Sequence, residues 1–206
     1  LQIGKAGDGQ ATTLNTANRT WTLQGTDGNP FNIIGASSLT ASTSTFSYEG
    51  ANAGGDTTIQ DATYNNLTIN ASDTFVPEAS PLVTNTDLTI TTGTLSMASN
   101  TLTVKDDLTV SGTLTISGTL GVGSSGVSNS GDISVAGTLT QSSSGTTTVK
   151  TSSSGSATIG GAGSLTFYNL DLAPDVNGST LYLGSAGSQT ISVSNDLTIG
   201  NGSNTV

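Results

Sequence analysis

The sequence lacks cysteine and histidine and contains few basic residues. Disulfide-stabilised scaffolds, zinc and haem centres and catalysis by histidine are therefore excluded. Four Lys and Arg residues stand against fourteen Asp and Glu residues, a net charge of −10, so we expect phosphate to be repelled and nucleic acid not to bind. No apolar run approaches the ~18 residues of a membrane-spanning helix, so no membrane span is expected in this segment.

Aromatic residues are also scarce, at 4%, and apolar residues make up only 33% of the chain. Such values are low for a compact core, and a disordered chain is one alternative. Disordered chains, however, are usually poor in β-branched residues and rich in charge. Here charged residues amount to 9%, while Thr, Val and Ile are plentiful, so the composition favours β-structure.

Short runs in which two branched apolar residues flank one hydroxyl residue recur along the chain. On a strand, both apolar side chains of such a run face one side and the hydroxyl faces the other. Gly, Asn, Asp or Ser bounds each run, which indicates short strands separated by turns. The runs include Leu67-Thr68-Ile69, Leu88-Thr89-Ile90, Leu108-Thr109-Val110, Leu114-Thr115-Ile116 and Leu197-Thr198-Ile199.

The runs belong to a longer repeat of about 20 residues, a period typical of a β-solenoid. The repeat predicts an all-β protein folded as a parallel β-solenoid (β-helix) of about ten short coils, each rising ~4.8 Å. Residues 61–206 carry the repeat, and residues 1–60 are interpreted as an irregular β region continuous with it. Tandem β-sandwich domains are the alternative. They are disfavoured because residues 82–163 contain no aromatic residue that could anchor a sandwich core.

The motifs Tyr64-Asn65-Asn66-Leu67-Thr68-Ile69 and Asp107-Leu108-Thr109-Val110 resemble repeats of large bacterial surface proteins. These are adhesin-like and autotransporter-passenger-like β-solenoid proteins, and the resemblance covers residues ~40–206. It implies a parallel β-helix, secretion to the cell surface or beyond, and a structural or adhesive role. It carries over no catalytic residue.

One aspartate opens each of four related motifs, and these aspartates are weak candidates for calcium ligands because oxygen-rich turns suit Ca²⁺. The alternative, which we favour, is that each aspartate caps a turn through its own backbone. No other cofactor is expected. The four residues are Asp87, Asp107, Asp132 and Asp196.

The adjacent pair Asp106 and Asp107 resembles the paired carboxylates of polysaccharide-cleaving β-helix enzymes. Neighbours on a strand point to opposite faces, so they make a poor acid–base pair unless they lie in a bend. We interpret Lys105 beside them as local charge balance. We therefore expect no enzymatic activity.

Three further surface functions are considered from residue patterns. Thr-x-Thr pairs at 101/103, 113/115 and 138/140 would order water as in ice-binding solenoids if they formed a flat array, but their spacing argues against one. Aromatic residues would form a sugar-stacking face, although in a thin core they more often fill coils; they are Trp21, Tyr48, Tyr64, Tyr168 and Tyr182. Candidate N-glycosylation sites are Asn18, Asn66, Asn70, Asn177 and Asn201.

Both ends of the sequence open or close in mid-pattern, as in a processed chain or a fragment. The expected assembly residues are Leu1, Ile3, Leu197, Ile199 and Val206, because an uncapped coil pairs with the next subunit head to tail. We therefore expect a non-enzymatic structural subunit of an extracellular filament, sheath or surface layer. The alternative is an adhesin stalk that binds glycans or cell surfaces.

Overall fold

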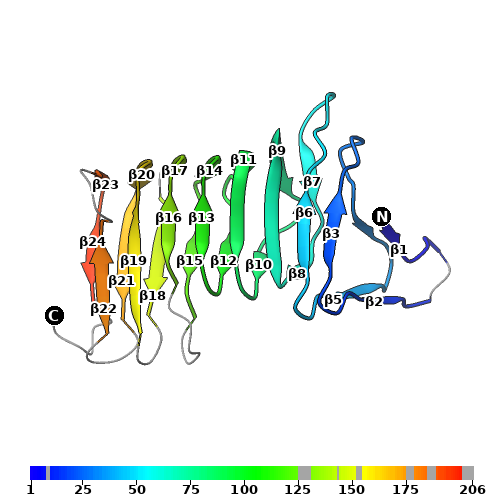
Figure 1. The fold of residues 1–206 in the computed structure, drawn as a ribbon, viewed down its shortest axis with the longest axis horizontal. Coiled ribbons are helices and arrows are strands. Elements are labelled where there is room, and N and C mark those ends of the chain that lie inside the picture. The colour runs from blue at the N-terminus through cyan, green and yellow to red at the C-terminus, as the bar shows by residue number, and fades with distance from the viewer. Residues whose placement is uncertain are drawn as a thin grey trace.

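The computed structural model describes residues 1–7, 10–124, 131–142, 144–151, 155–174, 179–184 and 189–200. These residues form 24 β-strands and no helix, and the strands stack along one long axis (Figure 1). Every strand pairing among them is parallel. The predicted β-solenoid is confirmed, and the alternative is wrong because β-sandwiches pack antiparallel sheets.

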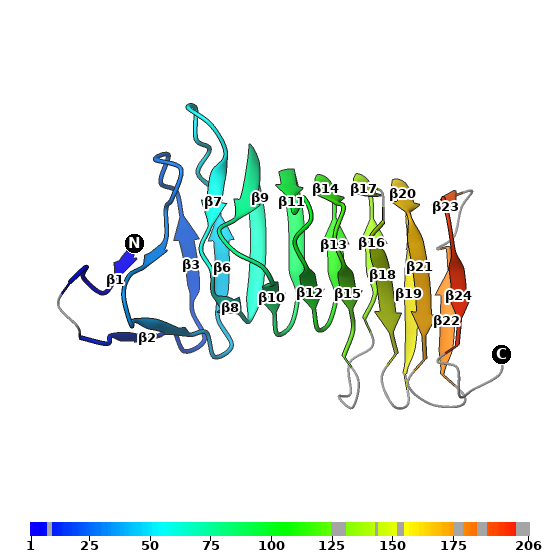
Figure 2. The same ribbon diagram turned by 180° about the vertical axis from the view of Figure 1, so that it is seen from behind.

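Each regular coil contributes a strand to each of three ribbons, in which strands of successive coils pair side by side (Figure 2). The first ribbon contains β3 (Thr20–Leu23), β6 (Thr45–Tyr48), the first halves of β9 (Asn66–Pro77) and β11 (Leu88–Ser96), β13 (Leu108–Val110), β16 (Ile133–Val135), β19 (Ser156–Gly161) and β22 (Thr180–Leu183). The second contains β7 (Thr57–Ile59), the second halves of β9 and β11, β14 (Thr113–Ile116), β17 (Thr138–Gln141), β20 (Ser164–Phe167) and β23 (Ile191–Val193). The third contains β8 (Thr63–Tyr64), β10 (Leu82–Thr84), β12 (Leu102–Val104), β15 (Leu120–Val122), β18 (Thr146–Lys150), β21 (Asn169–Ala173) and β24 (Leu197–Ile199).

The first strands of the chain pair separately from these ribbons. They form two small parallel pairs, one of β1 (Gln2–Ile3) with β4 (Asn32–Ile33) and one of β2 (Thr13–Asn15) with β5 (Ser38–Thr40). The same segment joins the first ribbon through the pairing of β3 with β6 and of β6 with β9.

The solenoid has about 7 turns, fewer than the ten or so expected. Its coils vary in length, with 20 residues between the paired Leu88 and Leu108, 25 between Leu108 and Ile133 and 26 between Ile133 and Ile159. The additional residues lie in the connections between strands, so each coil still adds one strand spacing to the rod. Dividing the length by a uniform 20-residue repeat therefore overestimated the number of coils.

The core is a column of apolar side chains enclosed by the three ribbons. Equivalent residues of successive strands stack in register, as Leu88, Leu108 and Ile133 do along the first ribbon, and all three are buried. The residue after each of them, such as Thr89 or Thr109, faces outward and is partly exposed. The alternation predicted from the sequence therefore decides which side chains enter the column.

Large aromatic side chains fill the core of the N-terminal coils. Phe31 and Phe46 are fully buried, and their ring centroids lie 5.1 Å apart. The buried hydroxyls of Tyr48 and Tyr64 lie 3.1 Å apart in a hydrogen bond. Burial raises the pKa of Tyr48 to about 12, so both phenols stay neutral over the ordinary pH range.

Candidate functional site

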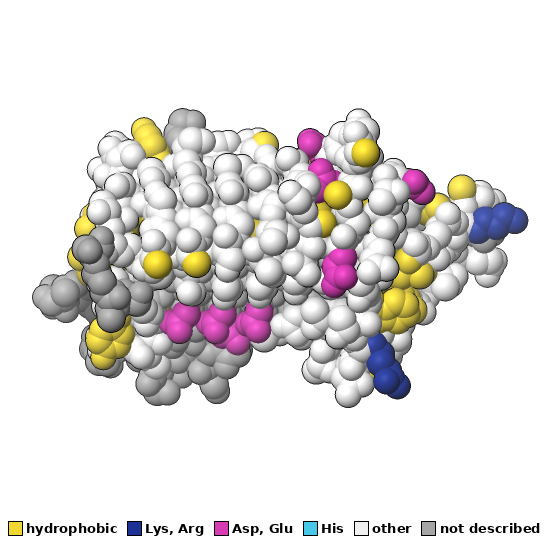
Figure 3. Space-filling model, turned by 45° about the horizontal axis from the view of Figure 1, so that its top comes forward, with side chains coloured by type: hydrophobic (Ala, Val, Ile, Leu, Met, Phe, Trp, Pro, Cys, Tyr) yellow, Lys and Arg dark blue, Asp and Glu magenta, His cyan; other side chains and the backbone are white. Residues whose placement is uncertain are grey.

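An acidic ladder follows the corner that leads into the first ribbon, and Figure 3 shows its carboxylates as a row along the rod. Each carboxylate accepts a hydrogen bond from the backbone of the next coil. Asp87 Oδ1 accepts from the Asp107 N–H at 3.3 Å, Asp107 Oδ1 from Asp132 at 3.0 Å, and Asp132 Oδ1 from Thr158 at 2.6 Å. Asn66 begins the ladder by accepting from the Asp87 N–H at 3.3 Å. The ladder therefore satisfies backbone donors where the chain leaves one ribbon for the next.

Asp196, grouped with these residues by its sequence motif, lies at a different corner. It precedes β24 of the third ribbon, and its backbone N–H donates to Asn169 Oδ1 at 3.3 Å. The four aspartates therefore lie at two different corners, because the motif Asp-Leu-Thr-Ile fits the start of a strand in either ribbon. Asn66 and Asn169 instead play equivalent parts at the two corners.

Three carboxylates of the ladder region converge. One oxygen each of Asp87, Asp106 and Asp107 lie within 4.8 Å of one another. Asp106 and Asp107 occupy a bend between β12 and β13, so the expectation that neighbouring carboxylates point apart does not apply to them. Lys105 Nζ donates to Asn85 Oδ1 at 2.7 Å, and its part in local charge balance stays a prediction.

Crowding at this corner changes the acidity of Asp107. Burial raises the pKa of its carboxyl, the hydrogen bond from the Asp132 backbone lowers it, and the charges of Asp132 and Asp87 raise it again, with a net increase. Carboxylates grouped in this way are the ligands that calcium prefers. The hydrogen bonds of Asp87, Asp107 and Asp132 come from backbone N–H groups of the next coil, 20 to 26 residues away, and not from their own turns as expected. Calcium binding stays a prediction.

Asp107→Asn is expected to stabilise the protein at neutral pH and to have no effect in acid. The raised pKa means that this group favours the folded state below its ordinary pKa of about 3.9, and the benefit is lost as pH rises through the folded-state value. Asparagine keeps the acceptor oxygen and removes the repulsion, for a gain of about 0.5 kcal/mol after allowing for solvent screening. Urea unfolding in EDTA at several pH values measures this gain.

A loss of stability at neutral pH would contradict this interpretation of Asp107. Asp73→Asn serves as the opposite control, because hydrogen bonds from Thr57, Asn52 and Thr74 outweigh burial and lower the pKa of that carboxyl. Its stabilising contribution is present above the ordinary aspartate pKa and is lost as pH falls through the lowered value. The Asp73 variant should therefore be less stable at neutral pH.

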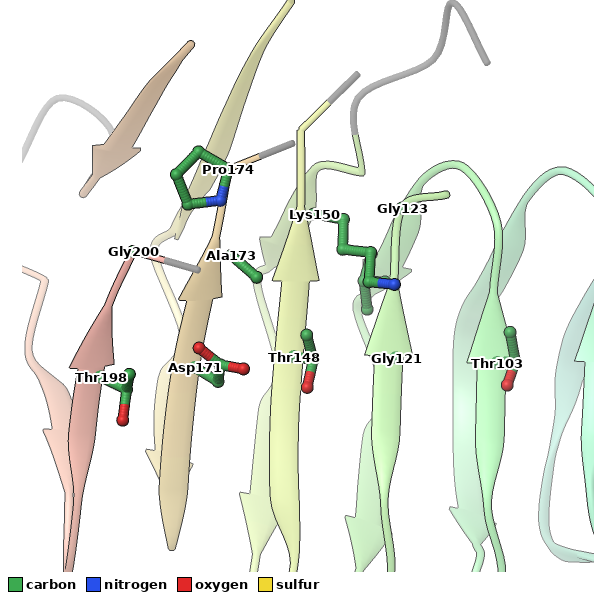
Figure 4. Close-up of a pocket in the computed structure, with 11 residues that line it drawn as sticks. Thr103, Gly121, Gly123, Thr148, Lys150, Asp171, Ala173, Pro174, Thr198 and Gly200 are labelled. Atoms are coloured by element: carbon green, nitrogen blue, oxygen red, sulfur yellow. The ribbon is translucent and has the colours of Figure 1, made fainter. Parts of the chain in front are cut away.

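A groove of about 790 Å³ lies on the outer face of the third ribbon (Figure 4). Its floor contains the middle residues of five successive strands, which pair directly with one another. In coil order these are Thr103, Gly121, Thr148, Asp171 and Thr198.

Small residues hollow out this face, and two charged residues supply its polarity. A side chain at Gly121 would meet nothing within 4 Å, so the space above it is open. Lys150 reaches from β18 toward β15, and Asp171 projects from β21 on the other side of β18 (Figure 4). The groove was not predicted from the sequence. Its signal is Gly121, a glycine at a position where the neighbouring strands carry Thr103 and Thr148.

Comparison with protein-family models, with curated proteins and with solved structures found no match. The solenoid is therefore described from its own geometry. In the described part of the chain, no helix has the length and apolar character required to cross a membrane.

The five candidate sugar-stacking residues differ in burial, and Trp21 and Tyr168 are partly exposed. Tyr48 and Tyr64 are fully buried, and Trp21 stacks on Phe46 with ring centroids 6.1 Å apart. Tyr182 alone among the five predicted aromatics is classed as exposed, at 55%. The favoured interpretation, that large rings fill coils, therefore holds for Tyr48 and Tyr64, whose strand positions face inward.

Two of the three predicted threonine pairs form a regular array. Thr113 and Thr115 of β14 pair directly with Thr138 and Thr140 of β17, so two hydroxyl columns run along the second ribbon. The expectation of irregular spacing is wrong for this face, because the unequal connections between coils leave the strand register intact. Thr101 and Thr103 belong to the third ribbon and do not join the array.

The glycosylation candidates differ in accessibility. Asn18 and Asn70 are exposed, whereas the side-chain oxygen of Asn66 is engaged in the acidic ladder. Asn177 and Asn201 lie outside the described residues. Glycosylation at Asn18 and Asn70 stays a prediction.

The candidate assembly residues also differ in their exposure to solvent. Leu1, Leu197 and Ile199 are exposed at 49%, 50% and 50%, whereas Ile3 is 5% exposed and belongs to the core. The prediction of Ile3 as a surface contact is wrong, because its strand pairs with β4 and directs the side chain inward. Val206 lies outside the described residues.

Proposed function

We propose that this protein is a non-enzymatic structural subunit of an extracellular filament, sheath or surface layer, in which solenoids stack end to end. One observation carries the proposal: the apolar column is open at the last described coil. Leu197 and Ile199 of β24 are each 50% exposed, although they pair with Leu170 and Leu172, which are 1% and 2% exposed. Leu183 of β22 is likewise 49% exposed, next to the buried Ile159.

The exposed leucine and isoleucine side chains occupy core positions and lack only a covering coil. No described strand pairs with the outer edges of β22, β23 and β24. At the other end of the first ribbon, β3 pairs with β6 alone among the described strands. Since both edges run parallel, a second copy continues the pairing in the same direction, and such a head-to-tail contact propagates into a filament.

A location outside the cell is part of this proposal and is supported by the resemblance of the repeats to those of bacterial surface proteins. Stacking would cover the open apolar end, with a gain of roughly 25 cal/mol for each Å² of apolar surface removed from water. The same contact would pair the exposed backbone groups at the edges of the strands.

The double variant Leu197→Asp/Ile199→Asp is expected to abolish assembly. The wild-type protein should form rods whose length grows with concentration, seen by sedimentation velocity and electron microscopy. The double variant should not, because carboxylates buried at the contact are unfavourable. Thr198→Asp is the matched control, since this residue lies between the two on the outward face. Short rods of one size at every wild-type concentration would contradict the proposal, as would equal loss of assembly in Thr198→Asp.

A further inference from the structure

The groove on the third ribbon has the features of a ligand site that is separate from the ends of the rod. It crosses β12, β15, β18, β21 and β24 and therefore runs along the rod axis. Four strand spacings give it a length of roughly 19 Å. A ligand that fills it must be extended and must repeat its contacts at intervals close to the spacing of the coils.

The polar groups of the groove are side chains of three kinds. Thr103, Thr148 and Thr198 carry hydroxyls, which both donate and accept hydrogen bonds. The carboxylate of Asp171 accepts and the ammonium of Lys150 donates. These groups match a polymer with many hydroxyls, because each hydroxyl of such a ligand also both donates and accepts.

The charge of the groove argues against an anionic ligand. Among the described lining residues, Lys150 and Asp171 contribute opposite charges and the others are uncharged, so this part of the lining is neutral overall. The whole chain carries a net charge of −10, which repels polyanions from every approach. An acidic polysaccharide or a nucleic acid is therefore disfavoured.

The backbone of the groove argues against an extended peptide. The inner groove strands β15, β18 and β21 each pair with a neighbour on both sides. Their N–H and C=O groups are used between coils, so a peptide gains none of the main-chain hydrogen bonds of strand addition. Only side-chain contacts are available, as a carbohydrate requires.

We infer that this groove binds a neutral polysaccharide along the axis of the solenoid. Asp171 and the threonine hydroxyls hydrogen-bond the sugar hydroxyls, and Lys150 donates to ring or hydroxyl oxygens. The open space above Gly121 admits the bulk of a sugar ring, while Ala173 and Pro174 supply apolar contact at one side (Figure 4). Binding there uses a face of the rod and does not depend on end-to-end assembly.

Affinity electrophoresis of the full chain in gels containing neutral glucan, mannan, galactan or xylan tests the inference. We expect retardation by a neutral polysaccharide and none by polygalacturonate or alginate. Gly121→Gln fills the groove without backbone strain, because this glycine is not among those with positive φ. Gly121→Gln and Asp171→Ala should each raise the dissociation constant by about tenfold, equivalent to ~1.4 kcal/mol.

Thr109→Gln is the matched control, because Thr109 occupies the equivalent outward position on the first ribbon. It should bind as the wild-type protein does, and thermal unfolding should show that all three variants fold. Absence of retardation by every neutral polysaccharide would overturn the inference. Retardation by the anionic polymers alone, or equal weakening in Thr109→Gln, would overturn it too.

Discussion

Gly137→Ala is expected to lower the free energy of unfolding by about 3 kcal/mol, the upper range for overpacking a tightly fitted site. A Cβ atom at this position would overlap the carbonyl oxygen of Gly112 and press on the backbone of Ser111. Neither segment can move away easily, because the adjoining strands pair with neighbours on both sides. The effect therefore comes from a backbone approach that only glycine permits.

The same close approach recurs at each coil of the corner between the first and second ribbons. A Cβ at Gly112 would press on Gly93, and one at Gly163 would overlap Gly137. The glycines form a stack in which each residue makes room for the carbonyl of the previous coil. Replacing any of these stacked glycines with alanine should therefore lower the free energy of unfolding for the same reason.

Gly121→Ala is the matched control, since a Cβ there meets nothing within 4 Å. We expect its stability to change by less than about 0.5 kcal/mol, with a small gain possible from the reduced entropy of the unfolded chain. Urea unfolding of the two variants side by side measures the difference. Equal losses of stability in Gly137→Ala and Gly121→Ala would contradict the close-approach explanation and would show that both substitutions act only through strand propensity.

Leu170→Ala is expected to cost about 3 kcal/mol, whereas Leu197→Ala should cost about 1 kcal/mol in the isolated subunit. The two leucines pair directly in β21 and β24, and they differ mainly in exposure, at 1% and 50%. Truncating Leu170 leaves a cavity between two coils. Truncating Leu197 removes a side chain that is already half exposed, so less buried apolar surface is lost.

This pair of variants also reports on assembly. At concentrations where subunits stack, the cost of Leu197→Ala should rise toward that of Leu170→Ala, because a second copy then covers β24. Thermal unfolding over a range of protein concentrations provides the measurement. A cost for Leu197→Ala that is high at the lowest concentration would mean that β24 is already covered within a single subunit.

Alternation within each run and the repeat of about 20 residues were together sufficient to predict the fold and most of its core. In the run Leu108-Thr109-Val110, for example, the two apolar residues are buried and the threonine is partly exposed. The motif could not predict the ribbon to which it belongs. Asp107-Leu108-Thr109-Val110 starts a strand of the first ribbon, and the similar Asp196-Leu197-Thr198-Ile199 starts one of the third.

The triplet Gly-Thr-Leu, which begins at Gly112, Gly118 and Gly137, shows the same limit. Gly112 and Gly137 belong to the corner before the second ribbon, whereas Gly118, in an identical Gly-Thr-Leu triplet, approaches Asn100 at the corner before the third. Local sequence specifies that a tight corner is needed. It does not specify which corner, because the path of the chain depends on the lengths of all preceding connections.

The sequence by itself determined the β-class and the inward or outward direction of most strand residues, because these depend on patterns two residues apart. It determined the parallel solenoid through the repeat of about 20 residues. Only the tertiary structure decided the number of coils, the partners of each carboxylate and the groove around Gly121. These features join residues 20 to 26 positions apart in successive coils. Strand register and connection length decide which residues of successive coils meet, and a single motif contains no information about either.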